Sequence, residues 1–165
     1  MATAGRSAEI PLLVIVDDDA STRISTQRLI RSFGFRANVF PSALEFLESG
    51  CAQDTACLIL DLRMPGMDGL QLQRLLASRS YQIPIIFVTA HGNDQDEREG
   101  MKAGAVGFLR KPVTKEALIN AIQTALTHAA PRRPDGGLIP GKWTVEKCSS
   151  AQVKGAEGNE EKSVQ

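Results

Sequence analysis

The apolar residues of the chain fall into short runs that alternate with segments of helical periodicity. Residues 12–16 read Leu-Leu-Val-Ile-Val, a continuous run of the kind buried on both faces of a parallel sheet. Between the runs, apolar residues recur three and four positions apart, which is typical of helices that pack on such a sheet. The runs that predict strands are 12–16, 35–40, 57–60, 85–88 and 105–109.

Polar residues and glycines mark the ends of the predicted helices. Ser21 is the predicted N-cap of the first helix, and Gly34 ends that helix. Gly50 is the predicted C-cap of the second helix, and either Asn93 or Asp94 can cap the fourth. Five strands alternating with five helices predict an α/β fold, with right-handed crossovers and helices on both faces of an open sheet.

Oxygen-bearing or charged side chains follow most of the predicted strands. In open α/β sheets the functional site lies outside the carboxyl ends of the strands, where the strand order reverses. We therefore expect these side chains to meet at one edge of the sheet. They are Asp17 and Asp18 after the first strand, Asp61 after the third, Thr89 after the fourth and Lys111 after the fifth.

Three carboxylates at one edge repel one another, and a hard divalent cation resolves that conflict. Mg²⁺ prefers an octahedral oxygen shell, and it commonly takes one or two carboxylates, several waters and a phosphate oxygen. Asp17, Asp18 and Asp61 are therefore predicted to form a magnesium site that is open to a phosphoryl group, with Asp61 as the nucleophile. Lys111 and Thr89 are predicted to contact phosphoryl oxygens through a charge and a hydroxyl.

Charge and hydropathy narrow the class of protein. The chain has 19 basic and 19 acidic residues, so it lacks the positive excess that favours nucleic acid or anionic membranes. No apolar stretch approaches the ~18 residues of a membrane span, and the N-terminus lacks the pattern of a signal peptide. We therefore expect a cytoplasmic protein with no direct nucleic-acid or membrane partner.

Composition also predicts the domain organisation. Residues 1–10 are predicted to be a flexible leader and residues 11–130 one folded domain. Residues 131–165 contain a Pro/Gly/Arg cluster followed by a Glu/Lys/Gly-rich stretch, so we expect a tail that cannot fold alone. That tail has no helical apolar periodicity, which argues against a DNA-binding domain within it.

Four segments resemble the motifs of response-regulator receiver domains, in the same order and at matching intervals. The similarity covers about residues 10–130. The sequences of the motifs are closest to those in receivers of the nitrogen-fixation and LuxR-type regulator group. It implies a flavodoxin-like (βα)5 three-layer sandwich whose parallel sheet has the strand order 2-1-3-4-5. The segments are Val16-Asp17-Asp18, Asp61 with Met64-Pro65-Gly66-Met67-Asp68-Gly69, Val88-Thr89-Ala90 and Leu109-Arg110-Lys111-Pro112.

The resemblance also implies roles for the residues near the magnesium site. A partner histidine kinase or a phosphotransfer protein would phosphorylate Asp61. Asp18 would bind Mg²⁺ directly, Asp17 largely through water, and the backbone carbonyl of Arg63 would be a further ligand. On this reading the chain is a signalling phosphoacceptor in a phosphorelay, rather than an enzyme that acts on other substrates.

A conformational switch is the second implication of the resemblance. Thr89 would move toward the phosphoryl group, and Phe108, at the aromatic switch position, would turn inward with it. The Lys111–Pro112 bond is expected to be cis, an arrangement for which X–Pro bonds are suited. The output surface would be the fourth helix, the fifth strand and the fifth helix, and it would bind a downstream protein target.

Three residues depart from the family pattern near that surface, namely Gly107, Arg110 and Val113, where the related regulators often have two acidic residues and an aromatic residue. None of them takes part in the predicted phosphoryl chemistry. They bear instead on which partner the domain selects. Asp19 is equally compatible with a role at the helix N-terminus and with membership of the metal site.

Three other functions are compatible with parts of the pattern. A haloacid-dehalogenase-type phosphatase would use Asp17 as nucleophile and Asp19 as acid, but the carboxylate pair that it needs after Lys111 is missing. A pseudo-receiver that only docks to partners would not need the complete acidic set. A truncated transcription factor is disfavoured by the composition of residues 131–165.

Overall fold

The computed structural model describes residues 10–128, which form alternating strands and helices around a single sheet. The predicted tail at 131–165, and all but the last residue of the predicted leader, lie outside the described residues. The elements are β1 (Leu12–Val16), α1 (Ala20–Ser32), β2 (Arg36–Phe40), α2 (Ala43–Glu48), the 3₁₀ segment η1 (Cys51–Asp54), β3 (Thr55–Leu60), α3 (Gly69–Ser78), β4 (Ile85–Thr89), α4 (Asp94–Lys102), β5 (Gly107–Arg110) and α5 (Lys115–His128).

All strand pairs are parallel, and the order across the sheet is β2-β1-β3-β4-β5. This confirms both the predicted α/β class and the strand order implied by the resemblance. The chain steps from β1 to β2 on one side and then crosses to β3 on the other. The carboxyl ends of β1 and β3 therefore lie side by side where the strand order reverses.

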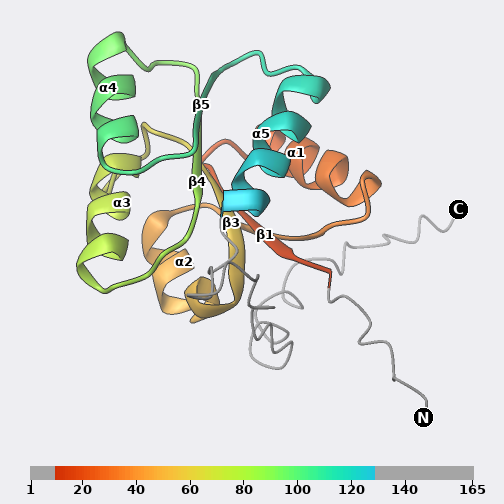
Figure 1. The fold of residues 1–165 in the computed structure, drawn as a ribbon, viewed down its shortest axis with the longest axis horizontal. Coiled ribbons are helices and arrows are strands. Elements are labelled where there is room, and N and C mark those ends of the chain that lie inside the picture. The colour runs from red at the N-terminus through yellow and green to blue at the C-terminus, as the bar shows by residue number, and fades with distance from the viewer. Residues whose placement is uncertain (1–9, 129–165) are drawn as a thin grey trace, which may run out of the picture.

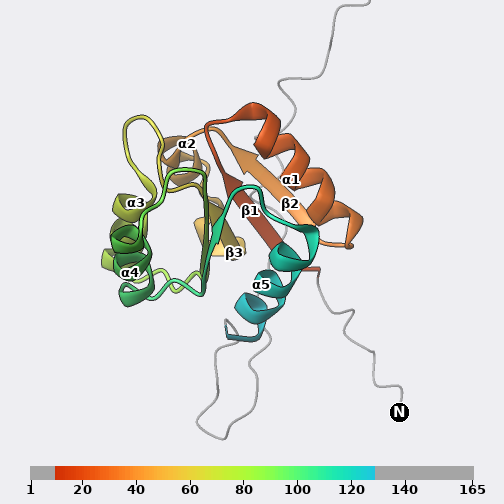
Figure 2. The same cartoon turned by 90° about the horizontal axis from the view of Figure 1, so that it is seen from above.

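Helices cover both faces of the sheet and make three layers (Figures 1 and 2). Helices α1 and α5 lie on one face, and α2, α3 and α4 lie on the other. Ile30, Leu118 and Ile122 are buried on the α1/α5 side, whereas Phe46 and Leu72 are buried on the opposite side. Every residue of β1, β3 and β4 is buried, which explains why their sequences are continuously apolar rather than alternating.

The start of β5 differs from the prediction by two residues. Ala105 donates its N–H to the carbonyl of Gly100, so it still belongs to the turn that ends α4. Gly104 makes that turn with a φ of 100°, a conformation that glycine adopts readily. The N–H of Val106 bonds the carbonyl of Ile85 at 2.8 Å, and the register of β5 with β4 begins at Gly107, opposite Ile86. The short η1 segment was not predicted either.

The predicted N-cap of α1 was wrong. Asp19, not Ser21, precedes the helix in an extended conformation, and its carboxylate accepts the N–H of Thr22 at 2.6 Å. Ser21 lies inside the first turn. The hydrogen bond from Thr22 lowers the pKa of Asp19, because it stabilises the ionised carboxylate. The helix-terminus role that the sequence left open for Asp19 is thus the one observed.

Among the helices of residues 10–128, none combines the length and the apolar character that crossing a bilayer requires.

Asp19→Ala is expected to lower the urea midpoint of unfolding, whereas Ser21→Ala is expected to leave it nearly unchanged. The first substitution removes the acceptor for a backbone N–H at the helix start, and the second does not. Because the pKa of Asp19 is lowered in the folded state, this contribution is present at neutral pH and is lost as the pH falls through that pKa. Equal midpoints for the two variants at pH 7 would contradict this assignment.

Candidate functional site

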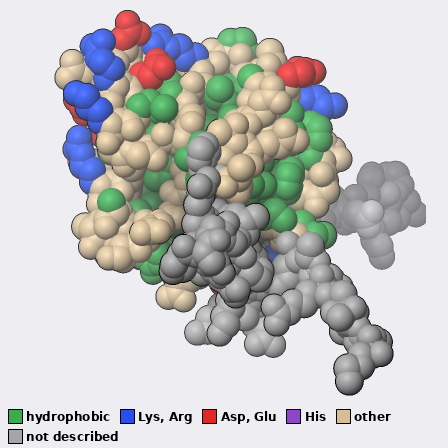
Figure 3. All heavy atoms as spheres, viewed as in Figure 1, with side chains coloured by type: hydrophobic (Ala, Val, Ile, Leu, Met, Phe, Trp, Pro, Cys, Tyr) green, Lys and Arg blue, Asp and Glu red, His purple; other side chains and the backbone are tan. Residues whose placement is uncertain are grey.

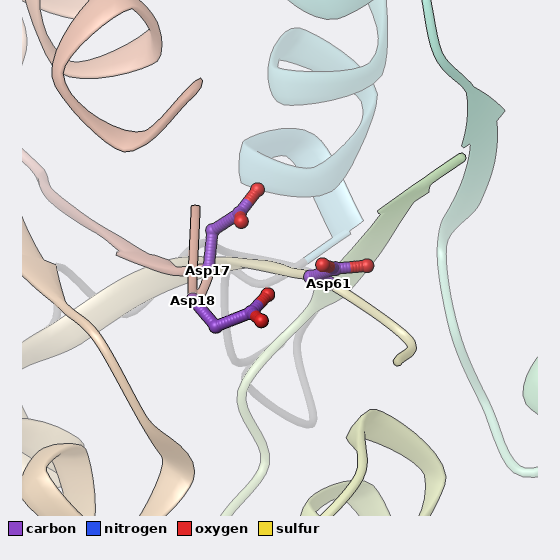
Figure 4. A group of neighbouring side chains, drawn as sticks. All are labelled: Asp17, Asp18 and Asp61. Carbon is purple, nitrogen blue, oxygen red and sulfur yellow. The ribbon is translucent and has the colours of Figure 1, made fainter. Parts of the chain in front are cut away.

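Backbone hydrogen bonds that continue past the strands bring the carboxylates together. The N–H of Asp17 bonds the carbonyl of Phe40 at 3.2 Å, and the N–H of Asp61 bonds the carbonyl of Val16 at 2.9 Å. Asp61 is therefore tied to the residue that directly precedes Asp17. Figure 4 shows the three side chains leaving the ends of β1 and β3 with their carboxyl groups turned to the same side.

The spacing of these carboxylates fits a single cation. One oxygen from each of Asp17, Asp18 and Asp61 lies within 4.8 Å of the others. Oxygens on opposite sides of a Mg²⁺ ion are about 4.2 Å apart, so a small contraction would bring these three into one shell. Asp18 is exposed, while Asp17 and Asp61 are buried, which leaves one side of the group open to water or a ligand. The residues present therefore fit the predicted metal site.

Lys111 brings a positive charge to the carboxylates of Asp17 and Asp61. Its Nζ lies 2.9 Å from Asp17 Oδ2 and 4.0 Å from Asp61 Oδ2. The N–H of Lys111 bonds the carbonyl of Thr89, which fixes its backbone at the end of β5 beside β4. The Lys111–Pro112 bond is cis, as predicted.

Both oxygens of Asp17 already have partners. Oδ1 accepts the N–H of Asp19 at 2.9 Å, and Oδ2 accepts from Lys111. The backbone carbonyl of Asp17 accepts from Arg23 Nη1 at 2.7 Å, so the turn after β1 is fixed from two directions. This carboxylate is therefore less free than that of Asp61 to form a bond with an incoming group.

The pKa of Asp61 is raised above its ordinary value. Burial is the main cause, because it removes water from the ionised carboxylate, and the negative charges of Asp17 and Asp18 act in the same direction. Lys111 and the N–H of Arg63, 3.4 Å from Asp61 Oδ1, partly offset this shift. A bound cation would favour the ionised form and so counter the shift further.

The side chains of Thr89 and Phe108 both lie against Gly92. Thr89 is 1% exposed, and its hydroxyl accepts the N–H of His91 at 3.2 Å. The Phe108 ring lies 6.0 Å from that of Phe87, centroid to centroid. A Cβ on Gly92 would fall 2.7 Å from both the Phe108 ring and the Thr89 methyl group. The sequence singled out Thr89 and Phe108 but not Gly92.

Arg63 connects the site to helix α4 through an ion pair with Asp96, a residue that the sequence did not single out. Its Nη2 lies 2.9 Å from Oδ2 of Asp96, a buried carboxylate in the first turn of α4. The two residues are 33 positions apart, and no local motif predicts their contact. The sequence predicted the backbone carbonyl of Arg63 as a metal ligand and gave no sign of this side-chain contact.

Residues 13–123 match the family described as the response regulator receiver domain. Over 128 residues the chain is 43% identical to the response regulator protein TmoT of Ectopseudomonas mendocina, an alignment that covers 78% of this chain and 58% of that protein. It is 36% identical over 119 residues to the transcriptional regulatory protein FixJ of Bradyrhizobium diazoefficiens, covering 72% of this chain and 58% of FixJ.

Solved structures agree with this result. The crystal structure of FixJ-N superposes with a TM-score of 0.66 at 38% identity, and the match covers 73% of this chain and 96% of that one. The response regulator StyR gives a TM-score of 0.69 at 44% identity and covers 73% and 61%. The chain thus spans 58% of the length of the curated relatives TmoT and FixJ.

Asp61→Asn is expected to stabilise the fold at pH 7 in the absence of divalent cations. Because the pKa of Asp61 is raised, the folded state binds its proton more tightly than the unfolded state, so ionisation weakens the fold as the pH rises through that pKa. The neutral amide avoids this penalty. The difference in melting temperature between Asp61→Asn and the unsubstituted protein should shrink as the pH is lowered. The control is Glu48→Gln, at the exposed end of α2, which should show no such pH-dependent difference. A variant no more stable than the unsubstituted protein at pH 7 would contradict the argument.

Gly92→Ala is expected to cost about 1–3 kcal/mol of unfolding free energy, because its Cβ must displace Phe108 or Thr89. Gly107→Ala is the matched control, since a Cβ there meets its nearest neighbour at an ordinary 3.7 Å. Urea unfolding of both variants measures the difference. Equal stability would mean that the gap between Thr89 and Phe108 accommodates a methyl group.

Proposed function

Because the chain belongs to the response regulator receiver domain family, we propose that it accepts a phosphoryl group on Asp61 and changes a partner-binding surface in response. The predicted resemblance to that family is confirmed by the match over residues 13–123. The observation that carries the proposal is the carboxylate group at the reversal point of the sheet, with Lys111 Nζ 4.0 Å from Asp61. The phosphoryl donor is a histidine kinase or a phosphotransfer protein.

In the transfer step an oxygen of ionised Asp61 attacks the phosphorus of a phosphohistidine. A new oxygen–phosphorus bond forms as the phosphorus–nitrogen bond breaks, and the imidazole leaves with the electron pair and takes up a proton. The reaction depends on positioning and on charge neutralisation rather than on a protein acid or base. Of the two buried carboxylates, Asp61 is the one with fewer hydrogen-bond partners, which supports it as the nucleophile.

Asp18, Asp61 and the Arg63 backbone carbonyl would hold Mg²⁺ directly, and Asp17 would contribute through water. When bound there, the ion would supply charge neutralisation for the approaching phosphoryl oxygens. Each Asp17 oxygen already accepts one hydrogen bond, from the N–H of Asp19 or from Lys111, which supports the water-mediated role. Asp18, the exposed member, has the space to ligate directly.

Phosphorylation then biases an equilibrium between two arrangements of the site. Lys111 gains the phosphoryl group as an anionic partner in addition to the carboxylates of Asp17 and Asp61. In this structure the Thr89 hydroxyl accepts a hydrogen bond from the N–H of His91. On phosphorylation it turns to donate to a phosphoryl oxygen, and the Phe108 side chain follows toward the core. The Thr89 methyl group and the Phe108 ring face the same narrow space beside Gly92, which supports this linkage.

The changed surface, formed by α4, β5 and α5, acts by protein contact in a cytoplasmic phosphorelay. Several relatives are named as transcriptional regulators, including FixJ and TdiR, and this chain spans little more than half of each. A stand-alone role without direct nucleic-acid binding therefore stays a prediction. The phosphatase alternative is disfavoured because Asp17, its nucleophile, has both carboxylate oxygens engaged.

Incubation with acetyl phosphate and Mg²⁺ should label Asp61, as detected by intact-protein and peptide mass spectrometry. Asp61→Asn should abolish the label, because it removes the nucleophile. Asp17→Asn should keep the label on Asp61 but slow its formation by roughly 10–100-fold, the usual effect of losing an outer-shell group. Labelling of Asp17 would instead support the phosphatase alternative, and a fully labelled Asp61→Asn variant would refute the proposal.

A further inference from the structure

Helix α4 contributes almost no apolar surface to the core. Its sequence from Asp94 to Lys102 is Asp-Gln-Asp-Glu-Arg-Glu-Gly-Met-Lys, and its buried residues are Asp96 and Gly100. These two are four positions apart and so lie on one helical face. Met101, its single large apolar residue, is 45% exposed. Hydrophobic burial therefore does little to fix where this helix lies.

Polar contacts hold α4 against α3 and the β3–α3 loop instead. Arg63 pairs with Asp96 at the start of the helix, and Gln73 Nε2 donates to the carbonyl of Gly100 at 3.0 Å near its end. Farther out, Arg74 pairs with Glu99 at 3.3 Å on the exposed side. Figure 3 shows charged side chains of both signs gathered at the upper left, where α4 lies in Figure 1.

The contact at the start of α4 is the one that reaches the phosphoryl site. Arg63 donates its N–H to Asp61 through the backbone and reaches Asp96 through the side chain. Asp96 Oδ2 accepts from both Arg63 and the N–H of Asn93, and Asn93 Oδ1 accepts the N–H of Asp96 in return. One oxygen thus serves both the ion pair and the capping box of α4.

We propose that Asp96 is a positioning residue that holds Arg63 in the site's resting arrangement and passes the state of Asp61 to the N-terminus of α4. The proposal rests on the proposed function of Asp61 as phosphoacceptor. A phosphoryl group on Asp61 places new negative charge two residues from Arg63. The guanidinium, which is half exposed, then has a second anion to bind.

The response of α4 follows from the shared oxygen. As Arg63 shifts toward the phosphoryl group, Asp96 loses its charged partner, and the capping contact with Asn93 loosens. The first turn of α4 then opens more often to water. The change appears in a helix of the proposed output surface without any rearrangement of apolar packing.

The experiment compares amide hydrogen exchange in the first turn of α4 with and without Mg²⁺ and beryllofluoride, which mimics a phosphoryl group on aspartate. In the unsubstituted protein, loading should speed exchange at Asp96 and Glu97 by roughly three- to fivefold, the scale of a partly exposed ion pair. In Asp96→Asn, which keeps an oxygen acceptor but not the charge, loading should change exchange by less than twofold. Glu99→Gln breaks the exposed pair between the same helices and should respond like the unsubstituted protein.

Arg63→Gln provides an independent test, because its side chain is half exposed and its loss leaves the core intact. It too should lose the response of α4, and adding Asp96→Asn to it should cause no further loss. An undiminished response in either single variant that takes up beryllofluoride would overturn the inference while leaving the proposed function intact. If the unsubstituted protein took up no beryllofluoride, the proposed function would fail and the inference with it.

Discussion

Three carboxylates held within 4.8 Å of one another repel, and the fold brings them together because two parallel strands end side by side. Much of the surrounding structure compensates for that repulsion. Lys111 and the N–H of Asp19 engage Asp17, while the N–H of Arg63 faces Asp61. The pKa of Asp61 nevertheless remains raised, because burial and the charges of Asp17 and Asp18 outweigh these contacts. A site with unbalanced negative charge and one open side is suited to a cation and to the anion that the cation attracts.

The sequence predicted the sheet, and the meeting of the three carboxylates with Lys111 at its edge, because both follow from chain direction. Continuous apolar runs identify β1, β3 and β4 as strands covered on both faces, and the residues just after them must then lie at one edge. The N-cap of α1 was missed because Asp19 and Ser21 are both good capping residues two positions apart, and local preference does not choose between them. Gly92 and Asp96 were missed for another reason. Their importance comes from contacts across the fold, with Phe108 and with Arg63, and spacing along the chain carries no sign of these.

The Phe87 ring lies against α3, α4 and β5 on one side of the sheet. A Cβ on Gly69, at the start of α3, would lie 3.0 Å from this ring, and a Cβ on Gly100, in α4, would lie 2.9 Å from it. The ring of Phe108 in β5 packs against it as well. Gly69 also lies against the backbone of Asp61, where a Cβ would come within 2.6 Å of the carbonyl oxygen. The Phe87 ring thus lies between the proposed phosphoryl site and the proposed output surface, and the small residues that face it set how closely α3 and α4 approach the sheet.

The glycine in α4 has a consequence for the energetics of movement. A helix that inserts leucines into a core leaves a void when it shifts, and voids are costly to open. Helix α4 presents Gly100 to the ring of Phe87, so a shift of the helix across that ring would leave little empty volume behind. The work of displacing it is mainly an exchange of hydrogen bonds and ion pairs with solvent. Its position should accordingly respond to the ionic strength of the medium more than that of a helix anchored by aliphatic side chains, which makes dissolved salt a second influence on the same surface.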